Sequence, residues 1–248
     1  MPPTPAAPEP PAEPTGYFAF GSNLWLAQMR TRCPSARYLG VARLPAYTWL
    51  INERGYANVV ESRTTAKETA EPTTTTTTNT AATATATANP NAEPTTNHVY
   101  GLIFTLTPSD ETSLDAHEGV PTAYTKEHLP VDFWAASSAD CRVDTTVPPT
   151  EAGGRMLVYV DRRRVVASTP RADYVYRINR GVEDAVRLGV PAAYVEGVVR
   201  RFVPAGEEGE EEGEESVEEA VKRQGAGIVD GEVGVDGRGR RGSGREVE

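Results

Sequence analysis

The chain has 248 residues, 38% of them hydrophobic, and a formal net charge of −10, which bounds it to one domain of ordinary size or two small ones. From Glu207 onward there are 14 acidic and 6 basic residues, so most of the charge lies in a C-terminal tail. No basic patch with interleaved aromatic residues appears, which argues against a nucleic-acid partner, and no apolar run is long enough to span a membrane.

Both ends and one internal segment have compositions that oppose packing. Residues 1–15 are rich in proline, and we expect them to be disordered. Residues 62–97 hold an unbroken threonine run followed by Ala-Thr alternation, with too little apolar surface to offset the entropy of ordering. We interpret them as a low-complexity insertion in a domain over 16–204, followed by a disordered acidic, Gly-rich tail over 205–248.

Residues 1–15 also lack an apolar core segment, so we expect no secretory signal and a cytoplasmic location. In a reducing compartment Cys33 and Cys141 are expected to be free thiols. Neither the cysteines nor the scattered histidines show metal-ligand spacing.

The first predicted element is a strand over Tyr17–Phe20 that enters a Gly-Ser-Asn turn, with a helix expected over 24–30. This geometry leaves backbone N–H groups unpaired, and such groups bind anions. Gly21 gives access to conformations that a Cβ forbids, and Ser22 and Asn23 can cap the helix or contact a ligand. On this stretch alone, an ordinary capped connection is the slightly better interpretation.

Further short strands are predicted along the domain, at 36–44, 47–52, 58–61, 98–106, 124–133 and 155–160, with a polar loop over 135–151. Apolar residues at helical spacing predict a helix over 174–188, and a second helix is expected over 192–202. This pattern favours an α+β fold in which helices flank a small, partly closed mixed β-barrel.

Glu118 is the residue most suited to chemistry. A short helix is predicted to start at Thr107 and Pro108 and to end at Glu118, just before Gly119. The negative end of the helix dipole and Asp115 at i−3 both disfavour ionisation, so we expect the pKa of Glu118 to be raised. Such a carboxyl group suits proton transfer near neutral pH. The alternative is a solvated surface glutamate beside a capping glycine.

Several motifs in one order carry a family resemblance: the heptapeptide 17–23, the segment Arg54-Gly55-Tyr56-Ala57-Asn58-Val59, the strand start Val99-Tyr100-Gly101, and Leu114-Asp115-Ala116-His117-Glu118-Gly119-Val120. Over about 16–204 the chain resembles the γ-glutamylcyclotransferase family of the AIG2-like superfamily. The resemblance implies a lyase of the acyltransferase type, active in glutathione metabolism. In such an enzyme the α-amine of a γ-glutamyl group attacks its own γ-carbonyl, which releases 5-oxoproline and a free amino acid without metal or cofactor.

The resemblance also implies roles for particular residues. Glu118 matches the catalytic glutamate, and Tyr174 matches a tyrosine that contacts substrate. Tyr124 is expected either to line the pocket or to lie in the core. The implied partner is a small γ-glutamyl compound, and the resemblance allows a homodimer. The remaining substrate-binding positions form the loop Tyr17, Phe18, Ala19, Phe20, Gly21 and Ser22.

Two alternatives stay open. One is a ligand-binding module of the same fold that does not turn its ligand over, although Glu118 beside an intact Gly21-Ser22-Asn23 favours the enzyme. The other is a related cyclotransferase that acts on γ-glutamyl amines or larger conjugates.

Overall fold

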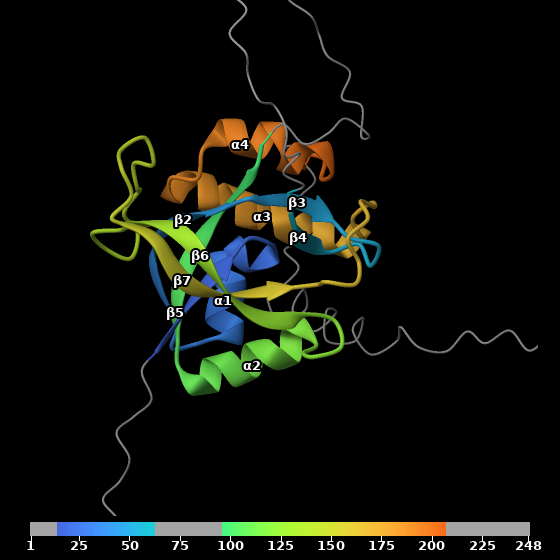
Figure 1. Ribbon diagram of the computed structural model, residues 1–248, viewed down its shortest axis with the longest axis horizontal. Helices are drawn as coiled ribbons and strands as arrows, with labels where there is room; N and C mark the ends of the chain where they lie inside the picture. Colours follow the sequence, from blue (N-terminus) through green and yellow to red (C-terminus); the bar gives the residue numbers. More distant parts are fainter. Residues whose placement is uncertain (1–13, 63–95, 207–248) are drawn as a thin grey trace, which may run out of the picture.

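The computed structural model describes residues 14–62 and 96–206 (Figure 1). Most of the two termini and of the insertion lie outside these described residues, but Thr15, expected in the disordered N-terminus, is the first residue of a strand. The strands are β1 Thr15–Ala19, β2 Arg37–Pro45, β3 Tyr47–Ile51, β4 Ala57–Glu61, β5 His98–Leu106, β6 Thr125–Ala135 and β7 Glu151–Val160. The helices are α1 Leu26–Arg32, α2 Pro108–Glu118, α3 Ala172–Leu188 and α4 Ala192–Gly197, with short 3-10 turns η1 Ser22–Leu24 and η2 Val199–Arg201.

Five strands form a closed barrel in the order β1-β5-β2-β6-β7, and β3 and β4 pair as a separate two-stranded sheet. Neighbouring barrel strands are antiparallel except β1 and β7, whose parallel pairing at Tyr17 and Leu157 closes the barrel. The predicted α+β architecture with a small mixed barrel is therefore confirmed, although the barrel is closed rather than partly closed.

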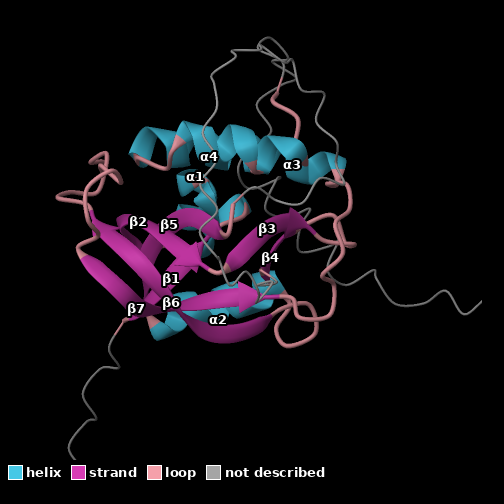
Figure 2. Cartoon of the chain, turned by 45° about the horizontal axis from the view of Figure 1, so that its top comes forward, coloured by secondary structure: helices cyan, strands magenta, loops and turns pink. Residues whose placement is uncertain are grey.

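Helices cover opposite sides of the barrel (Figures 1 and 2). Helices α3 and α4 lie along one side, and α2 lies on the other in both views. The helical spacing predicted for α3 is confirmed, because one face of it is buried through Tyr174, Ile178, Val182, Ala185 and Leu188. The strands contribute the rest of the core, including Phe18, Val41, Leu44, Leu102, Ile103, Leu106, Leu157 and Val158.

Helix α2 begins and ends where the sequence predicts. A capping box joins Thr107 and Asp110, because the Asp110 amide donates to the Thr107 hydroxyl at 3.2 Å while the Thr107 amide donates to Asp110 Oδ2 at 3.1 Å. Pro108 lies in the first turn, and Gly119 ends the helix in the left-handed conformation at φ 65°. Glu118 is thus the last helical residue, held at a defined place.

Three predicted boundaries are wrong. The helix expected over 24–30 is divided into η1 and α1, and the one expected over 192–202 into α4 and η2. Strand β7 starts at Glu151, inside the predicted loop, because it pairs with β6 as far as Phe133 opposite Glu151. Its first residues are exposed, so the hydrophobic pattern used for prediction is missing there.

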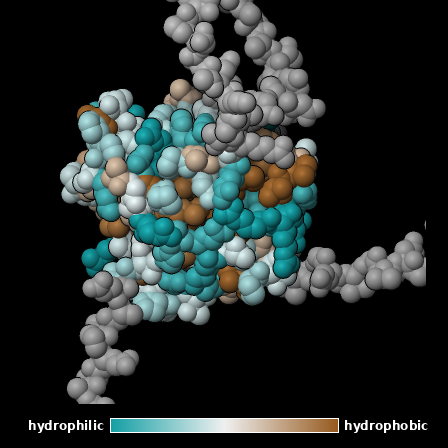
Figure 3. Space-filling view, in the orientation of Figure 1, coloured by the Kyte–Doolittle hydropathy of each residue, from teal (hydrophilic) through white to brown (hydrophobic). Residues whose placement is uncertain are grey.

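The surface of the described residues is mostly polar on the face shown in Figure 3. Large hydrophobic side chains that stay exposed are few, namely Val147, Val165, Val166 and Tyr176. Within the described residues, no helix is both long and apolar enough to cross a membrane.

Candidate active site

A small pocket opens where strand β1 ends, between the β1–η1 loop, the end of α2 and the β3–β4 hairpin. Its volume is about 40 Å³, room for only a few waters. Its walls are Tyr17, Phe20, Gly21, Ser22, Asn23, Arg54, Tyr56, Ala57, His117, Glu118, Tyr124, Tyr159 and Tyr174.

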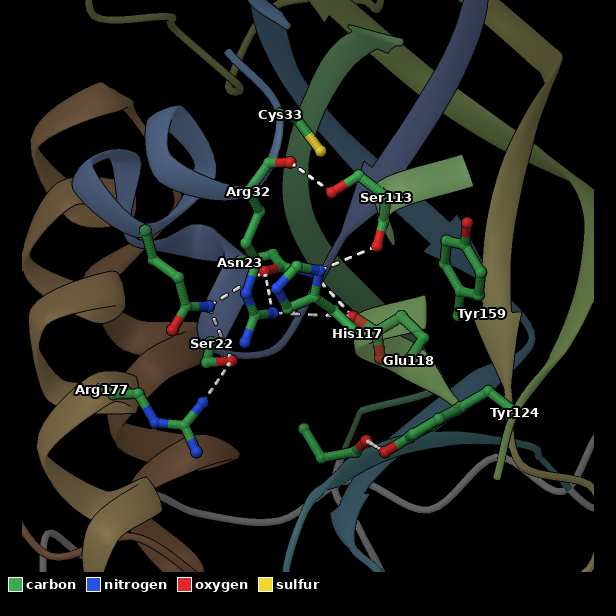
Figure 4. A network of polar contacts seen from close by, with 12 residues as sticks. Ser22, Asn23, Arg32, Cys33, Ser113, His117, Glu118, Tyr124, Tyr159 and Arg177 are labelled. Carbon is green, nitrogen blue, oxygen red and sulfur yellow. Dashed lines mark hydrogen bonds and ion pairs between the residues drawn. The ribbon is translucent and has the colours of Figure 1, made fainter. Parts of the chain in front are cut away.

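Glu118 is largely buried against the loop rather than solvated, so the interpretation as a surface glutamate is wrong. Its side chain is only 13% exposed. Carboxylate Oε1 accepts a hydrogen bond from Asn23 Nδ2 at 2.9 Å and lies 3.9 Å from Arg32 Nη1 (Figure 4). Burial raises the pKa of Glu118, while the Arg32 charge and the Asn23 hydrogen bond oppose the rise. The expected direction of the shift is therefore confirmed.

The expected cause of that shift is wrong in one respect. Asp115 does not face Glu118 as a second carboxylate: its oxygens accept from the Tyr159 hydroxyl at 2.6 Å and from Lys126 Nζ at 3.0 Å. The side-chain charges that act on the pKa of Glu118 come instead from Arg32, Arg177 and Arg54, after the larger effect of burial. Residues three apart on a helix have neighbouring Cβ atoms, but the Asp115 carboxylate is engaged by Tyr159 and Lys126.

Asn23 organises the polar network of the pocket. Its Nδ2 also donates to the Tyr17 hydroxyl at 2.9 Å, and its Oδ1 accepts from Arg32 Nη1 at 2.7 Å and Gln28 Nε2 at 2.9 Å. All hydrogen-bonding capacity of the amide is used, which fixes its orientation. Asn23 thus links the carboxylate to the buried Arg32, whose pKa burial lowers to about 10.

Gly21 is required by the space around it. Its φ is −115°, outside the left-handed region that favours glycine. A Cβ here would lie 2.8 Å from the Tyr174 hydroxyl and 3.3 Å from the Ala57 Cβ. A close approach to Gly21 is therefore present, but the approaching group is a side chain of the protein rather than a substrate.

Some of the backbone N–H groups around this turn donate to partners within the chain. The Ser22 and Ala57 amides both donate to the Tyr174 hydroxyl, at 3.2 and 3.3 Å. At the start of α1, the Leu26 amide donates to Asp184 Oδ2 at 2.9 Å. The N–H group at the start of α1 therefore holds a carboxylate of the chain itself, which agrees with the ordinary connection favoured for this stretch on its own.

Phenol groups form much of the pocket wall. Burial raises the pKa of Tyr174 to about 12 and the pKa values of Tyr17 and Tyr124 above their ordinary value, so all three stay protonated at neutral pH. Tyr124 donates to the Ala57 carbonyl at 2.9 Å and is 7% exposed. It is therefore both a buried residue and part of the pocket wall.

The structure brings most of the expected site residues together. Tyr17, Phe20, Gly21, Ser22 and Tyr174 line the pocket with Glu118, whereas Phe18 and Ala19 are buried outside its lining. Sequence reasoning missed Arg32, Arg177, Arg54, Tyr56, His117 and Tyr159.

One of the missed residues had a detectable sequence pattern. Arg32 follows Leu26 and Met29 at three-residue spacing on one helix face, and all three are buried. An arginine at a core position of an amphipathic helix indicates a buried charge that needs a partner.

Comparison with known proteins agrees with this architecture. Residues 98–198 match the model of the AIG2-like family. No curated protein matches.

Three solved structures share the fold. One described as a gamma-glutamyl cyclotransferase is 19% identical, with a TM-score of 0.51 over 85% of this chain and 99% of its own. An uncharacterized human protein is 20% identical, with a TM-score of 0.51 and the same coverage of both chains. YkqA from Bacillus subtilis is 17% identical, with a TM-score of 0.50 over 79% of this chain and 57% of its own.

The structural likenesses show the fold, and the family match covers the strand start at 99–101 and the Glu118 segment, but not the motifs at 17–23 and 54–59. Residues 98–198 are thus similar to the AIG2-like family, within a fold shared with a structure described as a gamma-glutamyl cyclotransferase.

Proposed function

We propose that the chain is a γ-glutamylcyclotransferase that converts a γ-glutamyl amino acid or peptide into 5-oxoproline and a free amino acid or peptide. The observation that carries the proposal is Glu118, a largely buried carboxylate of raised pKa held by Asn23 at the wall of a small pocket. A raised pKa makes the carboxylate a stronger base, which suits it to accept a proton and return it. A module that only binds a ligand would have no need of such a group.

In the proposed reaction, the Glu118 carboxylate takes a proton from the α-ammonium of the glutamyl group. The freed amine attacks the γ-carbonyl carbon, so a new C–N bond closes the five-membered ring. The bond from that carbon to the leaving nitrogen breaks as Glu118 returns the proton to that nitrogen. The ring nitrogen then gives up its second proton through Glu118 to the released amine, so that the lactam is neutral and the amine leaves as an ammonium ion. Atoms balance without water or cofactor, and much of the rate comes from holding one molecule in the attacking conformation.

Tyr174 is suited to stabilise the oxyanion that forms on the γ-carbonyl oxygen. Its hydroxyl oxygen accepts from the Ser22 and Ala57 amides, and these bonds polarise the O–H group. Its raised pKa keeps the proton on the oxygen. In this proposal the loop amides act through the tyrosine rather than by direct contact with substrate.

The test is a panel of γ-glutamyl compounds incubated with the purified protein, with release of 5-oxoproline as the readout. Time-dependent release with equimolar free amine supports the proposal. Binding of the same compounds without any release would instead support the non-catalytic module.

A further inference from the structure

Two hydrogen-bond donors at the β3–β4 turn lack partners. Arg54 Nη1 and the Tyr56 hydroxyl are buried, and neither has a hydrogen-bond partner within residues 14–62 and 96–206. Tyr56 is 6% exposed, and both residues line the pocket. Buried donors without partners are rare in native proteins and point to a missing water, ion or ligand.

The turn that carries these donors is held rigidly. Asn52 Oδ1 accepts from the Arg54 amide at 3.0 Å and from the Tyr56 amide at 3.3 Å. Gly55 has φ +81°, which favours glycine, and its carbonyl accepts from the Arg171 amide at 3.3 Å. Arg54 and Tyr56 are therefore presented to the pocket from a fixed backbone.

Arg54 forms no direct ion pair with an acidic side chain in the described part of the chain. The Arg54 guanidinium lies 5.5 Å from the centre of the Tyr56 ring. Arg32 and Arg177 are not part of the pocket lining and bond to Asn23 and Ser22. A guanidinium nitrogen without a hydrogen-bond partner, beside a phenol O–H, can bind a carboxylate.

We propose that Arg54, together with Tyr56, binds the carboxylate of the leaving amino acid and so selects γ-glutamyl amino acids over γ-glutamyl amines. This inference rests on the proposed function. The glutamyl amine must reach Glu118, which Asn23 ties to the β1–η1 loop. Arg54 lies on a different wall of the pocket. Of the three arginine charges that lower the pKa of Glu118, the charge of Arg54 has the smallest effect. The leaving group is the part of the substrate that extends beyond the glutamyl head.

The experiment compares γ-glutamyl-alanine with γ-glutamyl-ethylamine, which differ only by the carboxylate. We expect the wild-type kcat/KM for 5-oxoproline release to be about 10- to 100-fold higher for the alanine compound, the range for one charged hydrogen-bonded contact. Arg54→Met should bring the ratio near one, mainly through a higher KM for γ-glutamyl-alanine. Arg54→Lys, which keeps the charge but loses the planar fork, should fall between them.

Arg171→Met is the matched control. The Arg171 guanidinium also lies near the Tyr56 ring, at 5.8 Å, but it pairs with Asp173 and is not part of the pocket lining. This variant should keep the wild-type ratio. Circular dichroism confirms that each variant is folded.

Two results would overturn the inference while leaving the proposed function intact. One is an equal kcat/KM of the wild-type protein for the two compounds, a result that requires no variant. The other is an equal loss for both compounds in folded Arg54→Met, which would place the Arg54 contact on the glutamyl head. If the wild type releases no 5-oxoproline from either compound, the proposed function fails and takes the inference with it.

Discussion

Replacing Arg32 should make Glu118 a weaker acid and move the acid limb of the pH profile upward. Arg32 Nη1 lies 3.9 Å from Glu118 Oε1, and the Arg32 side chain is fully buried. Its positive charge lowers the pKa of Glu118 against the larger, opposite effect of burial. Arg32→Met removes that charge, so the ionised carboxylate is disfavoured and more of the enzyme holds Glu118 protonated at any given pH.

The size of the shift follows from the distance. Two unit charges 3.9 Å apart interact by about 4 kcal/mol at an effective dielectric constant of about 20, which corresponds to about three pKa units. The charges of Arg177 and Arg54 remain in the variant, and water entering the vacated space would reduce the effect. We therefore expect an upward shift of about one to three pH units, the range found for a carboxylate beside an arginine.

The assay is kcat/KM for 5-oxoproline release as a function of pH, since its acid limb reports the free enzyme's essential base. Arg32→Lys keeps the charge and should shift the limb much less. Asp115→Asn should leave it in place, because Asp115 is bonded to Tyr159 and Lys126. A folded Arg32→Met protein with an unmoved acid limb, or a downward shift in Asp115→Asn, would refute this account of the electrostatics.

Two further predictions concern the packing around the site. Gly21→Ala should lower stability by about 1–3 kcal/mol, the usual effect of overpacking, because the new Cβ would lie 2.8 Å from the Tyr174 hydroxyl. In a Tyr174→Phe background, thermal unfolding should show a smaller penalty, and an undiminished penalty would locate the clash elsewhere. Thr107→Ala should lower stability by about 1 kcal/mol through loss of the capping box. In Thr107→Ala the acid limb of the pH profile should not move. A shifted acid limb would show that the capping box also positions Glu118.

Local patterns in the sequence determine the elements that support the site. Helix α2 was predictable because Thr107, Pro108 and Gly119 specify its ends, and β5 was predictable from its run of β-branched and aromatic residues. The position of Glu118 at the end of α2 followed from these ends alone.

The contacts across the pocket were not predictable, because they join segments far apart in the chain. Asn23 meets Glu118 across 95 positions, and Ser22 meets Tyr174 across 152. A short sequence window cannot show that Tyr159 and Lys126 engage Asp115, or that Asp184 reaches the start of α1. The interpretation of Asp115 failed because it assigned a partner to this carboxylate from its neighbours in sequence.

The most direct test of the central claim is 5-oxoproline release by Glu118→Gln. Glutamine keeps the size of the side chain and can still accept from Asn23 Nδ2, but it cannot take up a proton. With folding confirmed by circular dichroism, we expect turnover to fall by about two to four orders of magnitude and KM to change less. A folded Glu118→Gln protein with turnover near that of the wild type would contradict the proposal that Glu118 carries the proton.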